Sequence, residues 1–155
     1  MEIRKAQIKD LKEIDEIYLE GMIYEEKNQS HKKSKKEILV DLNKSKKDRL
    51  NGFKEIIQSH KSKILVCEEN KKIIAFGNAI LSNKKRSAEV SLIYVRTEYH
   101  KKGIGSKILN ELLKYLKMKG EKKVYVTMDD TNNASIKLHK KAGFKRVAIF
   151  MEKKL

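Results

Sequence analysis

The sequence has a single cysteine, no proline and no tryptophan among its 155 residues. One cysteine cannot form an internal disulfide or supply a cysteine-based zinc site, so we expect neither a disulfide framework nor a metal site. No apolar run approaches the roughly 18 residues that a membrane-spanning helix requires. Residues 1–11 alternate charged residues with isoleucine and contain no apolar signal region. We therefore expect a cytoplasmic protein with no membrane partner.

Acidic residues are few relative to basic ones. The 21 Asp and Glu residues stand against 37 Lys and Arg, which gives a net charge of +16. Such a surface attracts polyanions through its summed field. Aromatic residues make up only 6% of the chain, however, too few to indicate a base-stacking platform for nucleic acid. Lysine is enriched over residues 27–63, where interleaved Asp and Glu are typical of solvated helix surfaces. Nucleic acid is therefore not the partner that we expect.

The pattern of hydrophobic residues predicts an α/β fold, with a mixed central β-sheet flanked by helices. Strands are expected at residues 3–6, 64–68, 73–81, 88–95, 124–128 and 146–151. Helices are expected at residues 11–21, where Gly21 ends the first one, in one or two segments between 38 and 57, at 105–119, and from about 133 to 142. Neither a linker nor an internal repeat divides residues 1–155, so we predict one domain.

The stretch from Ile93 to Lys107 is the most informative part of the sequence. A strand ends there, the chain turns through Gly103 and Gly105, and a long helix begins at once. A glycine turn at a helix N-terminus presents backbone N–H groups and the positive end of the helix dipole, which together bind anions. The dinucleotide fingerprint does not fit, because its third glycine would fall at Ile108, and the P-loop pattern fails as well. The turn predicts either a phosphate site or a tight connection with no ligand.

Two motifs in the sequence resemble those of the GNAT family of N-acetyltransferases, and they occur in the same order as in that family. Their defining residues are Tyr94, Val95, His100, Gly103 and Gly105 in the first motif, and Asn132, Gly143 and Phe144 in the second. The resemblance implies the GNAT (acyl-CoA N-acyltransferase) fold, one acetyltransferase domain over residues 1–155, and acetyl-coenzyme A (acetyl-CoA) as cosubstrate.

The resemblance also implies how the cosubstrate is held. Backbone groups of Ile93 and Val95 would pair with the pantetheine arm, and the N–H groups of residues 101–106 would cradle the pyrophosphate. Asn132 would contact the cosubstrate from the second motif, although a plain helix N-cap is an equally good interpretation. His100 replaces the Arg or Gln that is usual in the family. The full predicted set is Ile93, Tyr94, Val95, His100, Lys101, Lys102, Gly103, Ile104, Gly105, Ser106 and Asn132.

Acetyl transfer to an amine requires a base for the amine and a proton for the departing thiolate. Glu89 is the predicted base, because strict alternation along its strand places it on the face of Ser91, Ile93 and Val95. A solvated glutamate at a strand end is the alternative. His139 stands where the family frequently has the tyrosine that protonates the thiolate, so it is the predicted donor. A partly exposed helix histidine is the alternative there.

Together these features predict an acyltransferase that moves an acetyl group from acetyl-CoA to a primary amine by direct attack in a ternary complex. The acceptor would be a small-molecule or peptide amine. The alternative is a non-catalytic acetyl-CoA-binding module that docks nucleic acid or the ribosome through the basic helices.

Residues 144–155 have room for one last strand where the family often has two. A homodimer that completes this sheet edge is therefore a further possibility.

Overall fold

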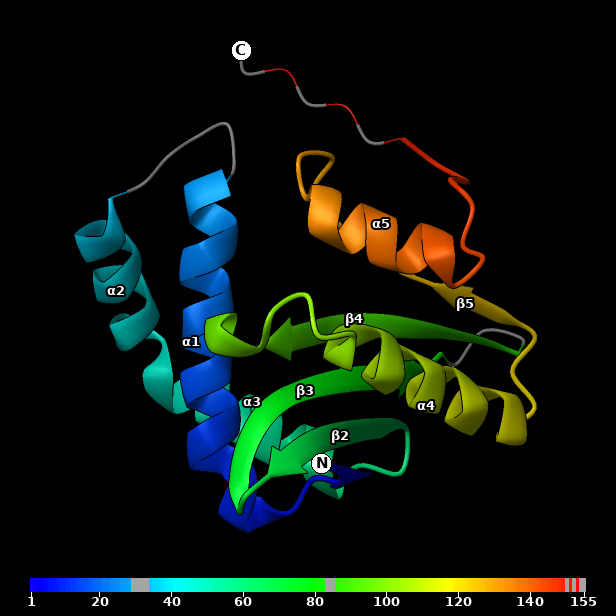
Figure 1. Cartoon of the computed structure of the whole chain (residues 1–155), viewed down its shortest axis with the longest axis horizontal. Helices are drawn as coiled ribbons and strands as arrows, with labels where there is room; N and C mark the ends of the chain where they lie inside the picture. Colours follow the sequence, from blue (N-terminus) through cyan, green and yellow to red (C-terminus); the bar gives the residue numbers. More distant parts are fainter. Residues whose placement is uncertain (29–33, 83–85, 150, 152, 154–155) are drawn as a thin grey trace.

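A sheet of five strands forms the centre of the molecule, in the order β1-β2-β3-β4-β5 (Figure 1). The computed structural model describes residues 1–28, 34–82, 86–149, 151 and 153. The strands are β1 (Glu2–Lys5), β2 (Ser62–Glu69), β3 (Lys72–Leu81), β4 (Ser87–Val95) and β5 (Lys123–Tyr125). Neighbouring strands are antiparallel except for β4 and β5, which are parallel. The predicted mixed sheet with flanking helices is thus confirmed.

Helices cover both faces of the sheet (Figure 1). They are α1 (Leu11–Asn28), α2 (Lys35–Lys44), α3 (Lys46–Gln58), α4 (Ile104–Met118) and α5 (Asn133–Lys141). Along β2, Leu65 and Cys67 pack on the α4 side, whereas Ile64 and Val66 pack with α1 and α3. Because both faces are covered, the central strands are nearly continuous in apolar residues. No helix in the described part of the chain is long and apolar enough to cross a membrane.

The first helix continues through Gly21, so the helix end predicted at this glycine is wrong. A helix-ending glycine adopts positive φ, and Gly21 does not. The glycine serves packing instead, because a Cβ built at Gly21 would lie 2.2 Å from Cδ1 of Tyr94 on β4. The ring of Tyr94 is in turn edge-on to that of Tyr18 on α1, with centroids 5.7 Å apart. The missing side chain at Gly21 lets α1 approach β4 closely.

A β-bulge interrupts the pairing of β3 with β4. Asn78 pairs with Leu92, but its neighbour Ala79 pairs with Val90, so Ser91 is an additional residue on β4. Asn78 is buried, and its Nδ2 donates a hydrogen bond to Oγ of Ser91 at 2.9 Å. An additional residue reverses the alternation of side chains between the two halves of a strand.

The bulge changes the face of the sheet that Glu89 occupies. Ala88 and Val90 pack with α4 in the same cluster as Ile93 and Val95. Glu89, which lies between Ala88 and Val90, therefore points to the other face, and its side chain is exposed. The prediction from strict alternation, which put Glu89 on the face of Ile93 and Val95, is wrong. Apolar residues occur on both faces of β4 near the bulge, so the hydrophobic pattern cannot reveal the additional residue.

The fourth and fifth strands separate after a short parallel pairing. Ser87–Glu89 pair with Lys123–Tyr125, and residues 126–128, which were predicted to continue the strand, are irregular. From Val90 to Val95 the outer edge of β4 has no neighbouring strand among the described residues. A strand edge of this kind presents backbone donors and acceptors that can pair with an extended ligand.

The last strand, predicted at residues 146–151, does not form in the residues that the structure describes. Residues 145–149 are irregular, with Val147 79% and Ile149 71% exposed, and Phe150 lies outside the described residues. Figure 1 shows the segment passing over α5 rather than along the sheet. Alternating apolar residues indicate a strand only where a neighbouring strand is available for pairing, and none lies beside this segment among the described residues.

Candidate active site

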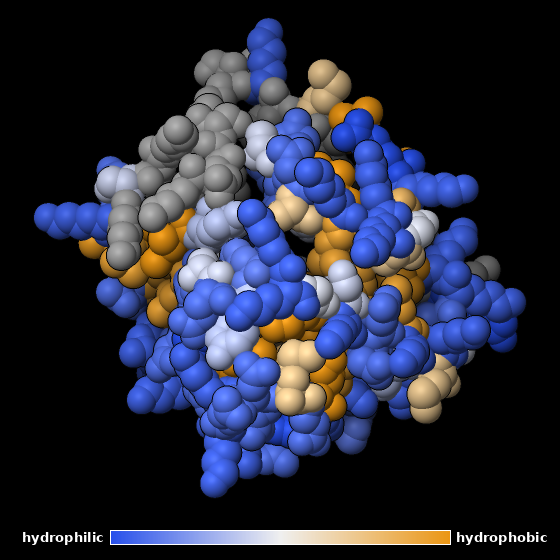
Figure 2. All heavy atoms as spheres, viewed as in Figure 1, coloured by the Kyte–Doolittle hydropathy of each residue, from blue (hydrophilic) through white to orange (hydrophobic). Residues whose placement is uncertain are grey.

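A cleft of about 680 Å³ lies between the outer edge of β4 and the chain from Val126 to Lys141. Its walls come from the C-terminal part of α1, β4, the turn before α4, the segment after β5, and α5. Figure 2 shows the molecule from the same side as Figure 1, with hydrophobic side chains visible between hydrophilic ones. A concave site of this size with apolar and charged walls is the first candidate for ligand binding.

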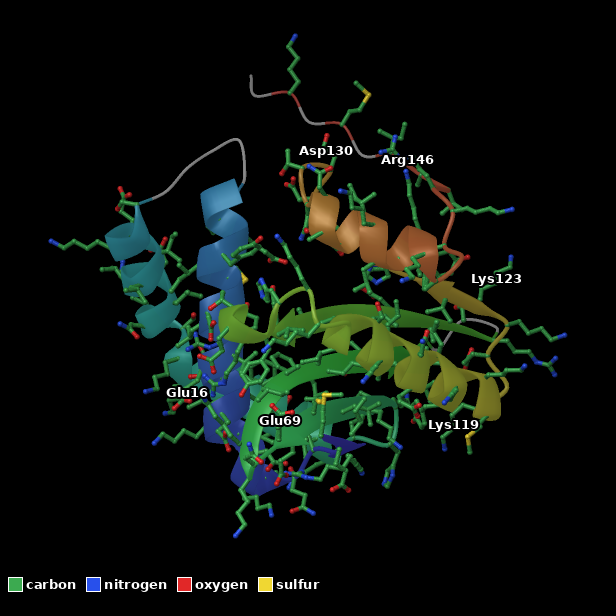
Figure 3. All side chains as sticks on the ribbon, viewed as in Figure 1. Glu16, Glu69, Lys119, Lys123, Asp130 and Arg146 are labelled. Carbon is green, nitrogen blue, oxygen red and sulfur yellow. The ribbon has the colours of Figure 1, made fainter. Side chains whose placement is uncertain are left out.

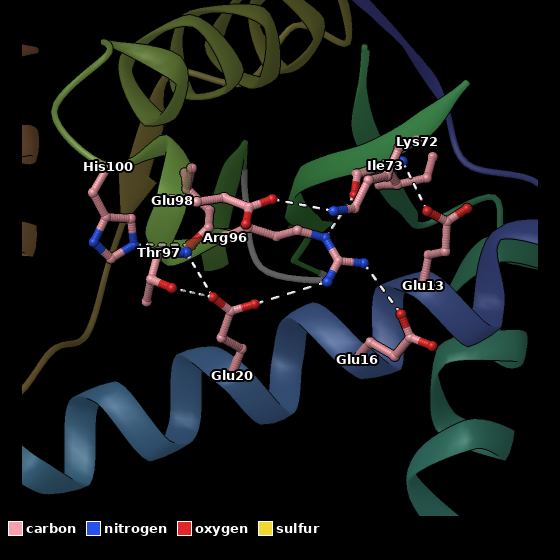
Figure 4. A network of polar contacts seen from close by, with 10 residues as sticks. Glu13, Glu16, Glu20, Lys72, Ile73, Arg96, Thr97, Glu98 and His100 are labelled. Atoms are coloured by element: carbon pink, nitrogen blue, oxygen red, sulfur yellow. Dashed lines mark hydrogen bonds and ion pairs between the residues drawn. The ribbon is translucent and has the colours of Figure 1, made fainter. Parts of the chain in front are cut away.

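Arg96, directly after β4, ties α1 to the sheet beside this cleft (Figure 4). Its Nε donates a hydrogen bond to the carbonyl oxygen of Ile73 at 2.9 Å. Its other guanidinium nitrogens lie 3.2 Å from a carboxylate oxygen of Glu16 and 3.8 Å from one of Glu20. Glu20 also accepts a hydrogen bond from the backbone N–H of Thr97 at 2.6 Å. Residues four apart share one face of a helix, so this face of α1 is fixed against the end of β4.

The turn between β4 and α4 brings a helix N-terminus to the cleft. Gly103 precedes the helix with a φ of 76°, in the left-handed region that favours glycine. The N–H of Lys107 donates to the carbonyl oxygen of Gly103 at 3.1 Å. The N–H groups of Ile104, Gly105 and Ser106 have no acceptor within the helix, and the glycine before them has no side chain to cap them. All three residues line the cleft.

Two glycines keep the surface of this turn free of side chains. A Cβ built at Gly103 meets no atom within 4 Å, so it would stand in open space. A Cβ built at Gly105 would come within 3.7 Å of side chains of Ile93 and Leu138. The cationic side chains that line the cleft belong to Lys101, Lys137 and Lys141. Bare backbone donors with lysines nearby suit a phosphorylated ligand.

The backbone of β4 presents polar groups to its outer edge at alternate residues. The N–H of Arg96 donates to the carbonyl oxygen of Ile74 on β3 at 2.9 Å. Two residues earlier, the backbone of Tyr94 therefore also faces β3. The backbone groups of Ile93 and Val95 consequently face the edge that no described strand covers. These two residues line the cleft, where an extended ligand can pair with them.

Glu25, near the end of α1, is a cleft residue that the sequence analysis missed. Its Oε2 accepts a hydrogen bond from the hydroxyl of Tyr94 at 2.8 Å, and its Oε1 accepts one from Nδ2 of Asn132 at 3.2 Å. Burial raises the pKa of Glu25, the two hydrogen bonds lower it in part, and the charges of Asp129 and Glu26 raise it. Burial also raises the pKa of the Tyr94 hydroxyl. No local signal marks Glu25, which lies in the part of α1 beyond the helix end predicted at Gly21.

Comparison with known proteins assigns the family. The sequence profile of the acetyltransferase (GNAT) family matches residues 21–144. The chain belongs to this family. The PaiA N-acetyltransferase of Thermoplasma acidophilum, solved in complex with coenzyme A, is similar over 93% of this chain and 89% of its own, with 25% identity and a TM-score of 0.78.

Two further relatives agree with this membership. An N-acetyltransferase from Staphylococcus aureus Mu50 is similar over 95% of this chain and 84% of its own, with 26% identity and a TM-score of 0.65. An uncharacterized N-acetyltransferase from Methanocaldococcus jannaschii is 30% identical over 97 residues. That match covers 59% of this chain and 43% of the relative, so the chain matches less than half of the relative's length.

At the first GNAT motif, His100 folds back onto the strand. Its Nε2 lies 2.9 Å from the carbonyl oxygen of Val95, so this nitrogen carries a proton and donates it. Lys102 does not line the cleft, and its ammonium group lies 4.7 Å from the ring centroid of Tyr99. The other ten residues that were predicted to bind the cosubstrate all line the cleft. Their role in binding stays a prediction.

The structure does not bring the two predicted catalytic residues of this GNAT chain together. His139 lines the cleft and is 5% exposed, so the alternative of a partly exposed histidine is wrong. Its Nδ1 donates to the carbonyl oxygen of Ser135 at 2.9 Å, and its buried Nε2 has no hydrogen-bond partner in the described part of the chain. Glu89 is exposed and does not line the cleft.

The second GNAT motif begins at Asn132, which makes two contacts. Its Oδ1 caps α5 by accepting a hydrogen bond from the N–H of Ser135 at 3.0 Å. Its Nδ2 donates to Glu25 on the other side of the cleft. The interpretation as an N-cap is therefore confirmed, and a contact with the cosubstrate stays a prediction.

Acidic residues precede this motif in the loop between β5 and α5. Asp129 lines the cleft. Hydrogen bonds from the side chain and the backbone of Thr131 hold the pKa of Asp129 below its usual value. Figure 3 shows Asp130 near the start of α5. The loop therefore places negative charge at the end of the cleft where Glu25 contacts Asn132.

Proposed function

We propose that this protein is an acetyl-CoA-dependent N-acetyltransferase that acetylates a primary amine of a small molecule or a peptide. The observation that carries the proposal is one cleft that joins an uncapped helix N-terminus to an open strand edge. A pyrophosphate and an extended pantetheine arm require an anion site and a strand edge, respectively. Membership in the GNAT family and the coenzyme A complex of PaiA support this assignment.

The donor end of the cleft is built mainly from backbone. The N–H groups of residues 104–106 would bind the pyrophosphate, and the outer edge of β4 would pair with the pantetheine arm. His100 already donates to the carbonyl oxygen of Val95. The arm would therefore pair with the backbone of Ile93 and with the N–H of Val95. Acetyl-CoA would supply an activated acetyl group as its thioester.

Direct attack by the amine in a ternary complex fits the nucleophiles of the chain better than an acetyl-enzyme does. Cys67 is the only cysteine and is buried in the core, where burial raises the pKa of its thiol. It therefore lacks the thiolate that covalent catalysis requires. His139 would protonate the leaving thiolate from Nε2. Because Nδ1 already donates to Ser135, this step requires the doubly protonated ring.

Thermal unfolding with and without acetyl-CoA tests the donor site, with 3′-phosphoadenosine diphosphate as the polyanion control. Acetyl-CoA at about 100 times its Kd should add about 2.7 kcal/mol, a rise in Tm of several degrees for a chain of this size. A larger rise with acetyl-CoA than with the control is expected. Equal rises would mean that the basic surface only binds phosphates, and no rise would refute the donor site.

Acetylation itself is then followed by mass spectrometry on a panel of primary amines. The panel contains a short diamine, a peptide with a free N-terminus and a peptide with a lysine side chain. Transfer to at least one of them is expected. Salt-sensitive binding to nucleic acid without any acetylation would favour the non-catalytic alternative instead.

A further inference from the structure

The carboxylate of Glu25 is held in place differently from that of Asp15, which is the buried carboxylate of α1. Asp15 is paired with Arg49, with 2.6 Å between Oδ1 and Nε. Glu25 instead accepts hydrogen bonds from two neutral groups, the Tyr94 hydroxyl and the Asn132 amide. No Lys or Arg of the described residues pairs with it, although the chain carries a net charge of +16. The carboxylate is thus fixed in position without being neutralised.

The surroundings of Glu25 increase its basicity. Burial raises its pKa, the hydrogen bonds from Tyr94 and Asn132 lower it in part, and the negative charges of Asp129 and Glu26 raise it. A paired cation would have lowered the pKa instead. A carboxylate whose pKa is raised toward neutral pH is a more effective general base than an ordinary surface glutamate.

Glu25 also lies on the side of the cleft that the donor does not need. Tyr94 sits between Ile93 and Val95, whose backbone faces the open edge, and its ring packs in the core on the α1 side of the sheet. Its hydroxyl therefore reaches Glu25 on the face opposite to the side chains of Ile93 and Val95. Each carboxylate oxygen of Glu25 accepts one protein hydrogen bond. A carboxylate oxygen has a second lone pair, which can accept an N–H from an ammonium group.

We propose that Glu25 is the general base that binds the acceptor ammonium group, an inference that rests on the acetyl transfer proposed above. One N–H bond of the ammonium group breaks, and an O–H bond forms on Glu25. The nitrogen lone pair then forms a bond to the carbonyl carbon of the thioester, and the C–S bond breaks with its electron pair on sulfur. His139 gives its Nε2 proton to the thiolate and takes up a second proton from the nitrogen, and the first proton passes from Glu25 to solvent. Tyr94 and Asn132 are positioning residues, because they act through the carboxylate.

Glu25→Gln in the full chain tests this assignment. The substitution keeps the size of the side chain but removes its ability to take a proton. Glu55→Gln is the matched control, because Glu55 is an exposed glutamate on α3 and does not line the cleft. The probe is the panel amine that the wild-type chain acetylates fastest. At neutral pH we expect kcat to fall about 10²–10⁴-fold in Glu25→Gln, with the KM for acetyl-CoA unchanged. Glu55→Gln should match the wild type.

The pH profile distinguishes a base from a structural residue. In the wild type, kcat/KM should fall on the acid side as Glu25 gains its proton, and this limb should be absent from Glu25→Gln. Tyr94→Phe keeps the ring in the core but removes a hydrogen bond that lowers the pKa of Glu25. It should therefore move the acid limb to higher pH. If Glu25→Gln does not fold, the pH profile of Tyr94→Phe tests the role of Glu25 instead.

The outcomes separate this inference from the proposed function. Wild-type kcat and an unchanged acid limb in Glu25→Gln, or an unmoved limb in Tyr94→Phe, would overturn the role of Glu25 and leave the enzyme assignment intact. An equal loss of kcat in Glu55→Gln would overturn it as well, since the loss would then follow from removing any one carboxylate charge. A wild-type chain that neither binds acetyl-CoA nor acetylates any amine of the panel would overturn the proposed function itself.

Discussion

The two sides of the cleft are built in different ways. The donor side is one continuous stretch of chain, from Ile93 through the glycine turn to Ser106, and it works through backbone groups. The opposite side is assembled from Glu25, Tyr94 and Asn132, and the sequence separations of its hydrogen bonds are 69 and 107 residues. A site made of consecutive backbone depends on local turn geometry, whereas a site made of distant side chains depends on how α1 packs.

The largest expected effect comes from releasing α1, which carries Glu25. Asp15 on α1 and Arg49 on α3 have side chains only 8% and 9% exposed. Asp15→Ala leaves the Arg49 guanidinium buried without its partner, which should cost about 3–5 kcal/mol in the free energy of unfolding. Urea unfolding measures this loss.

An exposed ion pair on α4 provides the control for that experiment. Glu111 and Lys114 lie 2.7 Å apart with side chains 42% and 70% exposed. Glu111→Ala should cost no more than about 0.5 kcal/mol, because solvent screens such pairs. Equal losses in Asp15→Ala and Glu111→Ala would mean that the buried pair does not hold α1.

Two helical glycines test whether α1 must approach β4 closely. Gly21→Ala places a methyl group against Tyr94, and the resulting overpacking should lower the free energy of unfolding by about 1–3 kcal/mol. Gly52→Ala in α3 meets no atom within 4 Å, so the higher helix propensity of alanine should raise it by about 0.5–1 kcal/mol. Thermal or urea unfolding should show that the two variants change the free energy of unfolding in opposite directions. The same sign in both would show that Tyr94 moves aside without cost.

A pair of left-handed glycines probes the donor side in the same way. Gly103 and Gly120 have φ of 76° and 81°, and neither has an atom within 4 Å of an added Cβ. Alanine at either position should lower the free energy of unfolding by about 1–2 kcal/mol through backbone strain. Only Gly103→Ala should also reduce the rise in Tm that acetyl-CoA produces, since Gly120 does not line the cleft. An undiminished rise in Gly103→Ala would show that the phosphate groups bind elsewhere.

The smallest effect is the pH dependence of stability that Glu25 contributes. Its pKa in the folded chain is raised above 4.5, so between 4.5 and the raised value the folded state binds more protons than the unfolded state. The wild type should therefore gain stability relative to Glu25→Gln as pH falls through this range, and lose it as pH rises through the folded pKa. Unfolding curves of both proteins between pH 4 and pH 8, roughly, measure the difference. A difference that does not change with pH would contradict the raised pKa.

Local signals in the sequence predict most of the donor side. Gly103 and Gly105 identify the turn, because the positive φ of Gly103 depends on only a few neighbouring residues. The cap at Asn132 is equally local. The positions of strands and helices along the chain follow from hydrophobic periodicity, and four of the six predicted strands differ from the observed ones only at their ends. The other two are β5, which is shorter than predicted, and the last strand, which has no neighbour to pair with.

The features that sequence reasoning missed depend on distant contacts. The sequence alone indicates a helix end at Gly21, because only the folded structure shows Tyr94 lying against this glycine. Glu89 is assigned to the wrong face because the additional residue at Ser91 shows only in the register with β3. Glu25 gains its surroundings from residues far along the chain, so nothing near it in sequence marks it as different from Glu26.

The distance in sequence between Glu25 and Asn132 also has a consequence in time. Synthesis proceeds at about 5–20 residues per second, so the 107 positions between them take roughly 5–20 s to translate. During that interval the nascent chain contains Glu25 but lacks Asn132 and α5, so the carboxylate remains in contact with water. The raised pKa of this carboxylate therefore arises only after Asn132 has been translated.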